Sequence, residues 1–205
     1  MAEGFEALVL KTEPSGESFL KLHLLTVEQG VFLCLKRISK KSNRSTNPDL
    51  FDQAIVELER SKQGGDLQFV TDYQLIQRRE AIGQSYHSLR AAASLSQLLV
   101  HNAAHMPESE ALFELMNRAL AAFASGKAPE VVLLKSIYLL LKDEGYPVRE
   151  SWWPKLPQSL RQPTKALLMA PAPEQLTQAE KENCQKILQN LHDWMRHHTD
   201  LVLPS

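Results

Sequence analysis

The stretch Leu20–Lys36, LKLHLLTVEQGVFLCLK, contains two short segments of alternating apolar residues separated by a turn. In the first segment leucines alternate with Lys21 and His23, and a second alternation begins after Gly30. A period of two residues is that of a β-strand with one buried face, and glycine suits the turn between two such strands. The stretch therefore predicts two neighbouring strands.

Strand patterns continue on both sides of this stretch. An earlier alternation runs from Phe5 to the turn Glu13-Pro14-Ser15-Gly16, and later ones lie near Ala54 to Leu58 and Leu67 to Leu75. Five short antiparallel strands in about 75 residues are the scale of a small barrel, in which closure removes exposed sheet edges. We expect residues 1–76 to form an OB-fold, although an SH3-like barrel would fit the same pattern.

From residue 77 onward the period becomes that of helices. Apolar residues at spacings of three and four predict helices over about 78–105, 109–126 and 129–145. Prolines and Trp152-Trp153 predict an irregular connection near residues 147–173, with a short helix from Leu160 to Met169 and the tryptophans against the bundle. Thr177 and Glu180 form a capping box for a final helix. The sequence thus predicts an α+β protein in which an all-α helical bundle, residues 77–205, follows the barrel.

The composition is that of an ordinary globular protein, with 43% apolar residues, 23% charged residues and a formal net charge of -1. A uniformly basic, histone-like mode of nucleic-acid binding is therefore excluded. The first residues, MAEGFEALVLKTE, contain early acids and lack the basic segment of a signal peptide. No later run approaches the ~18 apolar residues of a membrane span. We expect a cytoplasmic protein with no membrane partner.

Positive charge is concentrated in the stretch Leu35–Arg44, LKRISKKSNR, which contains no acid. Such a run is more often a solvated loop than a binding site. However, it directly follows a predicted strand, and OB-type barrels bind nucleic acid through charged loops between strands. Phe32 and Phe51 flank the stretch and could stack on bases, but core packing is the more common role of aromatic residues in strands. The residues predicted to contact DNA are Lys36, Arg37, Lys40, Lys41 and Arg44, together with Lys62 in a later glycine-containing turn.

No persuasive catalytic constellation is present in the sequence. His101 and His105 have the spacing of an H-E-x-x-H zinc site, but an asparagine replaces the catalytic glutamate. The segment Gly83-Gln-Ser85 lacks the second glycine of G-x-S-x-G and is interpreted as a polar helix start. Cys34 could pair with His23 as nucleophile and base, although a lone cysteine in a strand is usually a packed residue. We therefore expect a protein without enzymatic activity, cofactor or metal.

Several motifs follow one another along the chain. They are the ALVL strand with the turn Ser15–Ser18, the segment Leu24–Gly30, the basic stretch, the run ALFELMNRALAAFASG over Ala111–Gly126, and Glu144-Gly145-Tyr146. In this order the motifs resemble the RecO family of bacterial recombination mediators. The resemblance implies an OB-fold followed by a helical domain. It also implies a non-enzymatic function in DNA repair: binding single- and double-stranded DNA, annealing complementary strands, and acting with RecR to replace single-stranded-DNA-binding protein (SSB) by RecA.

The resemblance further implies roles for particular residues. The basic stretch matches the family's K-G-A-R-R-type loop, with Arg37 at the usual glycine position. Many relatives carry a four-cysteine zinc module after the third helix, whereas Trp152 and Trp153 lie in that region here, so no zinc is expected. Lys135 corresponds to a basic position in the family's R-F-E-L-type helix, here K-S-I-Y. It is the candidate residue for binding the acidic, phenylalanine-ended C-terminal tail of SSB.

Two further classes of function are compatible with the sequence. The barrel and bundle could form a protein-interaction adaptor without DNA binding, in which the basic loop contacts an acidic protein. The third hypothesis is a hydrolase that uses Cys34 as its nucleophile.

Overall fold

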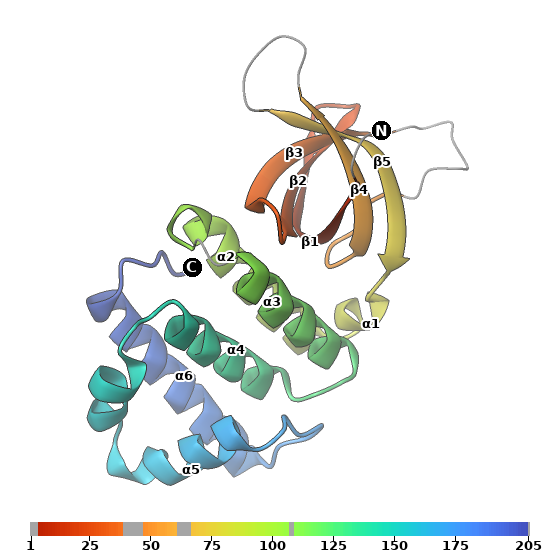
Figure 1. Ribbon diagram of the computed structural model, residues 1–205. Coiled ribbons are helices and arrows are strands. Elements are labelled where there is room, and N and C mark those ends of the chain that lie inside the picture. Colours follow the sequence, from red (N-terminus) through yellow and green to blue (C-terminus); the bar gives the residue numbers. More distant parts are fainter. Residues whose placement is uncertain (1–3, 39–46, 61–66, 107–108, 205) are drawn as a thin grey trace. The chain divides into compact units, whose positions relative to one another are not determined.

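The computed structural model describes residues 4–38, 47–60, 67–106 and 109–204 (Figure 1). The chain divides into two compact units. The barrel unit comprises residues 1–79 and 103–113, and the helical unit comprises residues 80–102 and 114–205. A single boundary after residue 76 does not produce this division, because residues 103–113 belong to the barrel unit although they follow the helix that begins at Tyr86.

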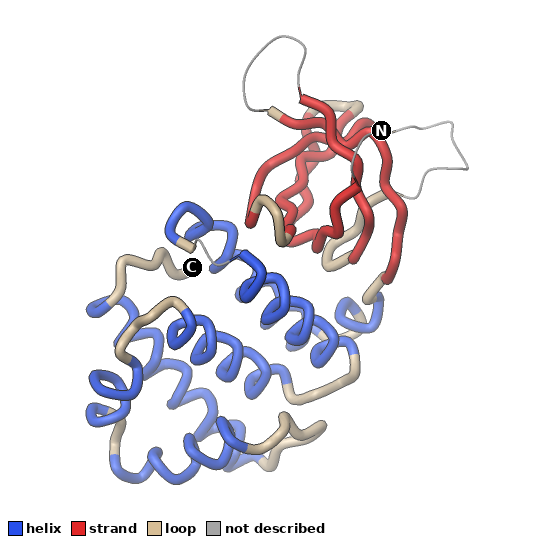
Figure 2. The backbone as a smooth tube through the Cα atoms, in the orientation of Figure 1, coloured by secondary structure: helices blue, strands red, loops and turns tan. Residues whose placement is uncertain are grey.

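The barrel unit contains a closed barrel of five strands, visible as a ring in Figure 2. The strands are β1 (Gly4–Ser15), β2 (Phe19–Thr26), β3 (Gly30–Arg37), β4 (Gln53–Arg60) and β5 (Gln68–Gln77). Their order around the barrel is β1-β2-β3-β5-β4, and β4 pairs back with β1. The predicted strands are confirmed, but they are not all antiparallel, because β3 and β5 pair in parallel.

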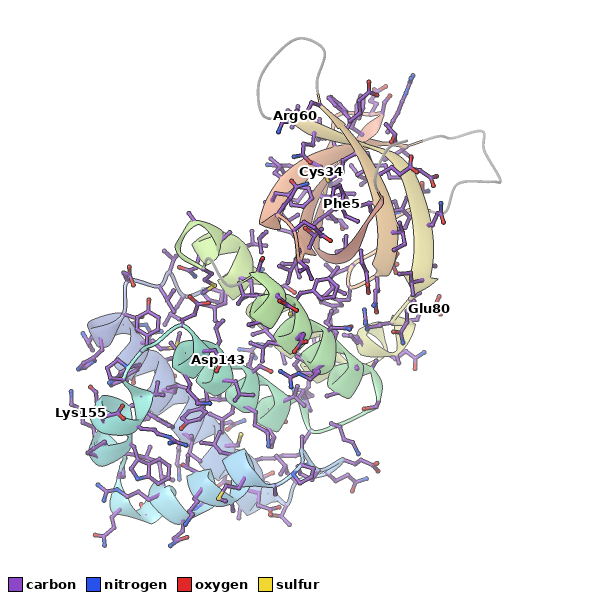
Figure 3. The ribbon with its side chains drawn as sticks, viewed as in Figure 1. Phe5, Cys34, Arg60, Glu80, Asp143 and Lys155 are labelled. Carbon is purple, nitrogen blue, oxygen red and sulfur yellow. The ribbon has the colours of Figure 1, made fainter. Side chains whose placement is uncertain are left out.

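Alternation along each strand produces the core of the barrel. Cys34 is fully buried and Phe5 packs against the core, and Figure 3 labels both within the ring of strands. Burying one valine or leucine side chain contributes about 1.5–3 kcal/mol, so burial of this cluster is the main stabilising term of the barrel. The buried residues of the cluster are Ala7, Val9, Leu22, Leu24, Cys34, Ala54, Val56, Val70 and Tyr73.

A buried carboxylate links the segment before β4 to the end of β5. Asp52 is fully buried and accepts hydrogen bonds from Arg78, from Nε at 3.0 Å and from Nη2 at 2.9 Å. Its Oδ2 atom also accepts from the Tyr73 hydroxyl at 2.9 Å and from the Asp49 N–H at 2.9 Å. Burial and the Asp52 carboxylate raise the pKa of Tyr73, and the hydrogen bond to Asp52 raises the pKa of Arg78. Arg78 is therefore charged and the Tyr73 phenol neutral at ordinary pH.

Contacts at the turn between β2 and β3 account for the place of residues 103–113 in the barrel unit. The hydroxyl of Ser109 donates to the carbonyl oxygen of Val27 at 2.5 Å. Gly30, in the same turn, has a positive φ of 66°, and a Cβ atom added to it would lie 3.6 Å from the Ser109 side chain. Ser109 is the first residue of α3 (Ser109–Ala124), and its hydroxyl donates to the barrel.

The predicted helix over 78–105 is interrupted. Gly83 ends α1 (Glu80–Gly83), and the Ser85 Oγ atom accepts a hydrogen bond from the Ser88 N–H at 3.3 Å at the start of α2 (Tyr86–Asn102). The interpretation of this segment as a polar helix start is thereby confirmed. The remaining elements are η1 (Ala103–His105), α4 (Pro129–Asp143), η2 (Val148–Trp152), η3 (Trp153–Lys155), α5 (Gln158–Met169) and α6 (Gln178–His198).

Helix α4 is the centre of the helical unit, where it packs against α2, α5 and α6. The helix begins at Pro129, and Gly145 beyond its end has a φ of 80°, a conformation that glycine adopts without strain. In the connection that follows, Trp152 is fully buried and its indole N–H donates to Asn190 of α6 at 2.9 Å. The predicted packing of this tryptophan is confirmed, and the connection is more regular than expected. The capping box of Thr177 and Glu180 is also confirmed.

Within the described residues, none of the helices combines the length and the apolar character needed to cross a membrane.

Asp52→Asn breaks a buried ion pair and should lower the free energy of unfolding by about 3 kcal/mol. We expect the low end of the usual range because the Arg78 side chain is 28% exposed and can be hydrated. Urea unfolding followed by circular dichroism measures this loss. Asp49→Asn is the matched control, since Asp49 is exposed and lies in the same segment. Equal unfolding midpoints for the two variants would contradict a structural role of the Asp52 carboxylate.

Candidate nucleic-acid interface

The outer surface of β2, β3 and β5 combines aromatic and basic side chains. In the strand register Phe19 lies opposite Arg37, Lys21 lies opposite Leu35, and Phe69 lies beside Leu35. Register partners point to the same side of a sheet, and the residues that alternate with them, such as Cys34, fill the core. These five side chains therefore point away from the barrel interior. We call them the aromatic face: Phe19, Lys21, Leu35, Arg37 and Phe69.

The two phenylalanine rings of the aromatic face contact each other. Their centroids are 6.1 Å apart and their planes are inclined by 63°, which is an edge-to-face arrangement. Both side chains are half-buried, and neither belongs to the residues that pack against the core, which include Phe5 and Phe32. The ring pair is therefore a surface feature of the barrel, with part of each ring exposed.

The positive charges of the aromatic face differ in their surroundings. Lys21 Nζ lies 3.9 Å from Glu13, whose carboxylate also pairs with Lys11 at 2.9 Å. The Lys11 hydrogen bond is the main reason that the pKa of Glu13 is lowered. Arg37 is exposed and forms no ion pair with any of the residues described in the structure. Its guanidinium is thus available for a phosphate beside the Phe19 ring.

Lys36 lies on the opposite side of β3 from Arg37. It is only 7% exposed, and its ammonium nitrogen is 5.8 Å from the centroid of the Tyr73 ring, a cation–π contact inside the barrel. Its register partners Leu20 and Val70 also point inward. Burial lowers the pKa of Lys36, and Asp72 opposes this effect. The prediction that Lys36 contacts DNA is incompatible with this position, because neighbouring residues of a strand point to opposite faces.

The other residues predicted to contact DNA follow the ends of β3 and β4 in the sequence. Lys40, Lys41, Arg44 and Lys62 lie outside the described residues and stay predictions. Arg37 ends β3 three residues before Lys40, and the exposed Arg60 ends β4 two residues before Lys62 (Figure 3).

The two aromatic residues that flank the basic stretch belong to the interior. Phe51 is 2% exposed and has a positive φ of 67°. Phe32 packs against the core of the barrel. Core packing, the favoured interpretation of both side chains, is confirmed.

Phe19 and Phe69 did not emerge from the sequence as functional candidates. Phe19 is the first residue of β2 and Phe69 is the second residue of β5, and both are out of phase with the buried alternation. A large aromatic residue at such an outward position is the signal that could have identified them. Their proximity could not have been inferred, because it depends on the pairing of β5 with β3.

The cysteine and histidine candidates do not form sites among the described residues. Cys34 is fully buried in the core, which raises its thiol pKa to about 12, whereas His23 points outward opposite Leu33. They cannot act as nucleophile and base across opposite faces of the sheet. Helix α2 ends at Asn102, so His101 and His105 do not share one α-helix. Within the described chain, no group of three or more metal-ligating side chains occurs.

The helical unit contains a groove of about 500 Å³ with an apolar floor and a basic rim. Its basic residues are Arg149 and Lys165. Met169, at the end of α5, is 76% exposed and contributes to the apolar surface. The complete lining is Tyr138, Arg149, Trp153, Lys165, Leu168 and Met169.

Lys135, the predicted contact for the SSB tail, is used within the helical unit itself. Its ammonium group donates to the carbonyl oxygens of Leu167 at 3.3 Å, Leu168 at 3.1 Å and Ala170 at 2.5 Å. A cation at this position satisfies the free carbonyls of the last turn of α5 and opposes the helix dipole. Burial lowers the pKa of Lys135. The groove therefore takes its positive charge from Arg149 and Lys165, and Lys135 holds the end of α5 beside it.

Lys36→Met should preserve or raise the free energy of unfolding near pH 7, because the substitution removes a buried ammonium group. The pKa of Lys36 is lower in the folded state than the ~10.4 of an unfolded chain, so the unfolded state binds more protons between the two values. The contribution of Lys36 to stability therefore rises with pH in that window. Urea midpoints at about pH 7 and pH 10 should converge between wild type and variant. Lys21→Met is the control, since the Lys21 side chain is 41% exposed. A lower midpoint for Lys36→Met at pH 7 would contradict this account.

No protein-family model and no curated protein matches the chain. The aromatic face is therefore argued only from the strand register, ring contacts and charges of the chain itself.

Proposed function

We propose that the barrel is an OB-fold. This fold is a five-stranded Greek-key barrel that binds oligonucleotides on the face of strands 2 and 3 and through the loops between strands 1 and 2 and strands 4 and 5. The insertion of β5 between β3 and β4 supports the proposal, since an antiparallel meander would have no parallel pair. The aromatic face supports it as well. Phe19 follows the β1–β2 turn, and Phe69 follows the β4–β5 connection.

The proposed function is DNA binding without enzymatic activity, in a recombination mediator that resembles the RecO family. The observation that carries it is the ring pair of Phe19 and Phe69 beside Arg37, which forms no ion pair with any described residue. Single-stranded nucleic acids are bound by this combination of aromatic surfaces and positive charge. The order of the sequence motifs supports the wider role: binding single- and double-stranded DNA, annealing complementary strands, and acting with RecR and SSB in the loading of RecA.

The groove of the helical unit is the proposed site for the SSB tail. An acidic peptide that ends in phenylalanine would place its ring on the apolar floor near Trp153 and Leu168. Its carboxylates would lie against Arg149 and Lys165. In this proposal Lys135 acts indirectly, because its ammonium group already bonds three carbonyl oxygens at the end of α5.

The second candidate function is a protein-interaction adaptor that does not bind DNA. The groove favours it, because its apolar floor and basic rim suit an acidic peptide without any contribution from the barrel. The two candidates differ in one measurable property. An adaptor captures the acidic peptide but binds DNA weakly and without salt dependence.

Arg37→Glu should weaken binding of single-stranded DNA about tenfold and reduce the slope of log affinity against log salt by about 1, because one phosphate contact becomes a repulsion. Fluorescence anisotropy with a labelled oligonucleotide between about 50 and 200 mM salt measures both quantities. Arg118→Glu is the matched control, since Arg118 is exposed on α3. If Arg37→Glu and Arg118→Glu weaken DNA binding by the same small factor, the proposal that the barrel binds DNA is refuted.

Arg149→Glu combined with Lys165→Glu should abolish binding of an acidic peptide that ends in phenylalanine, because both cations of the groove are reversed. Peptide anisotropy measures the loss, and Lys181→Glu on the exposed start of α6 controls for the change in net charge. A peptide without its terminal phenylalanine should bind wild type weakly. Retention of the peptide by the double variant would exclude the groove as its site.

A further inference from the structure

We infer that the aromatic face selects unpaired bases: Phe19 and Phe69 each stack on a base of a single strand, which gives the barrel a preference for single-stranded over duplex DNA. This inference rests on the proposed DNA-binding function and specifies the form of DNA that this face recognises. It follows from the separation of the two rings, their inclination and the distribution of charge around them.

The geometry of the ring pair does not match stacked DNA. Successive bases along one strand of duplex DNA are ~3.4 Å apart and parallel. The two rings are 6.1 Å apart and inclined by 63°. Two consecutive bases therefore cannot remain stacked on each other and also lie flat on both rings. A single strand can meet the geometry, because its bases can separate and turn independently.

Duplex DNA offers little to this pair of rings. In a duplex the faces of the bases are covered by their neighbours, and only base edges and the phosphate backbone reach a protein surface. Arg37 and Lys21 can contact phosphates of either form of DNA. Phe19 and Phe69 gain stacking energy only from bases that have left the helix. The phenylalanines therefore raise the affinity for single-stranded DNA above that for duplex DNA. The cations raise the affinity for both forms.

Positive charge lies close to both rings of the aromatic face. Strand β3 lies between β2 and β5, so Arg37, opposite Phe19, is on the strand that separates the two phenylalanines. Lys21 is on β2, opposite Leu35. Phosphates are attracted to these cations, so the backbone of a bound strand should pass over β2 and β3 while its bases reach the rings.

The test measures the ratio of single-strand to duplex affinity. Phe19→Ala and Phe69→Ala should each weaken binding of an oligothymidine of about 20 nucleotides roughly tenfold, with a much smaller effect on a duplex of equal length. Phe19→Tyr and Phe69→Tyr keep an aromatic ring and should restore the ratio. Tyr86→Ala removes an aromatic side chain that is 70% exposed in the helical unit and serves as the matched control.

An abasic oligonucleotide separates base stacking from phosphate contacts. Wild type and both alanine variants should bind it equally, because it offers phosphates but no bases. Circular dichroism and retained duplex binding show whether the variants are folded, and Phe19→Leu provides a variant of similar apolar volume. Equal losses of single-strand, duplex and abasic binding would overturn the inference while leaving DNA binding intact. If wild type binds no form of DNA more tightly than Arg37→Glu does, the proposed function itself fails.

Discussion

The buried carboxylate of Asp52 is the interaction on which the closure of the barrel depends. It holds Arg78 beyond the end of β5, while the Asp52 carbonyl oxygen accepts from Val9 of β1 at 2.9 Å. The Phe51 N–H donates back to Val9 at 2.9 Å, and Phe51 adopts a positive φ of 67°. A strained backbone at a bulky residue persists only where surrounding contacts determine it. These contacts fix the entry of β4, which can then pair with β1 on one side and β5 on the other.

The aromatic face is a consequence of this closure. Because β4 pairs with both β1 and β5, the remaining edge of β5 pairs in parallel with β3. That pairing places Phe69 beside Leu35 and brings its ring to 6.1 Å from Phe19, although Phe19 is in β2 and Phe69 is in β5. Long-range pairing of this kind is set by the whole sheet, not by local sequence. The proposed function therefore depends on an arrangement that no single motif encodes.

Local patterns predicted the elements of the fold, and long-range contacts decided what those elements form. Alternation located the five strands, and the capping box at Thr177 located α6, because both signals depend on neighbouring residues. The parallel pair of β3 and β5 and the place of Ser109 in the barrel unit depend on contacts between distant segments. For the candidate site, the sequence pointed to the end of β3 but treated the positive charges there as one surface. The pleat of β3 sends Lys36 inward and Arg37 outward.

A cation can serve a ligand only if the protein has not already satisfied it. Two lysines that the sequence offered for binding are engaged internally: Lys36 lies over the Tyr73 ring, and Lys135 bonds three carbonyl oxygens at the end of α5. Withdrawing either one for a ligand would leave a protein group without its partner, which opposes the gain from binding. Arg37 on the barrel, and Arg149 and Lys165 at the groove, stand beside apolar surface that a ligand can cover. Binding at those positions adds a contact without breaking one, so they are the cations that recognition of DNA or of an acidic peptide would use.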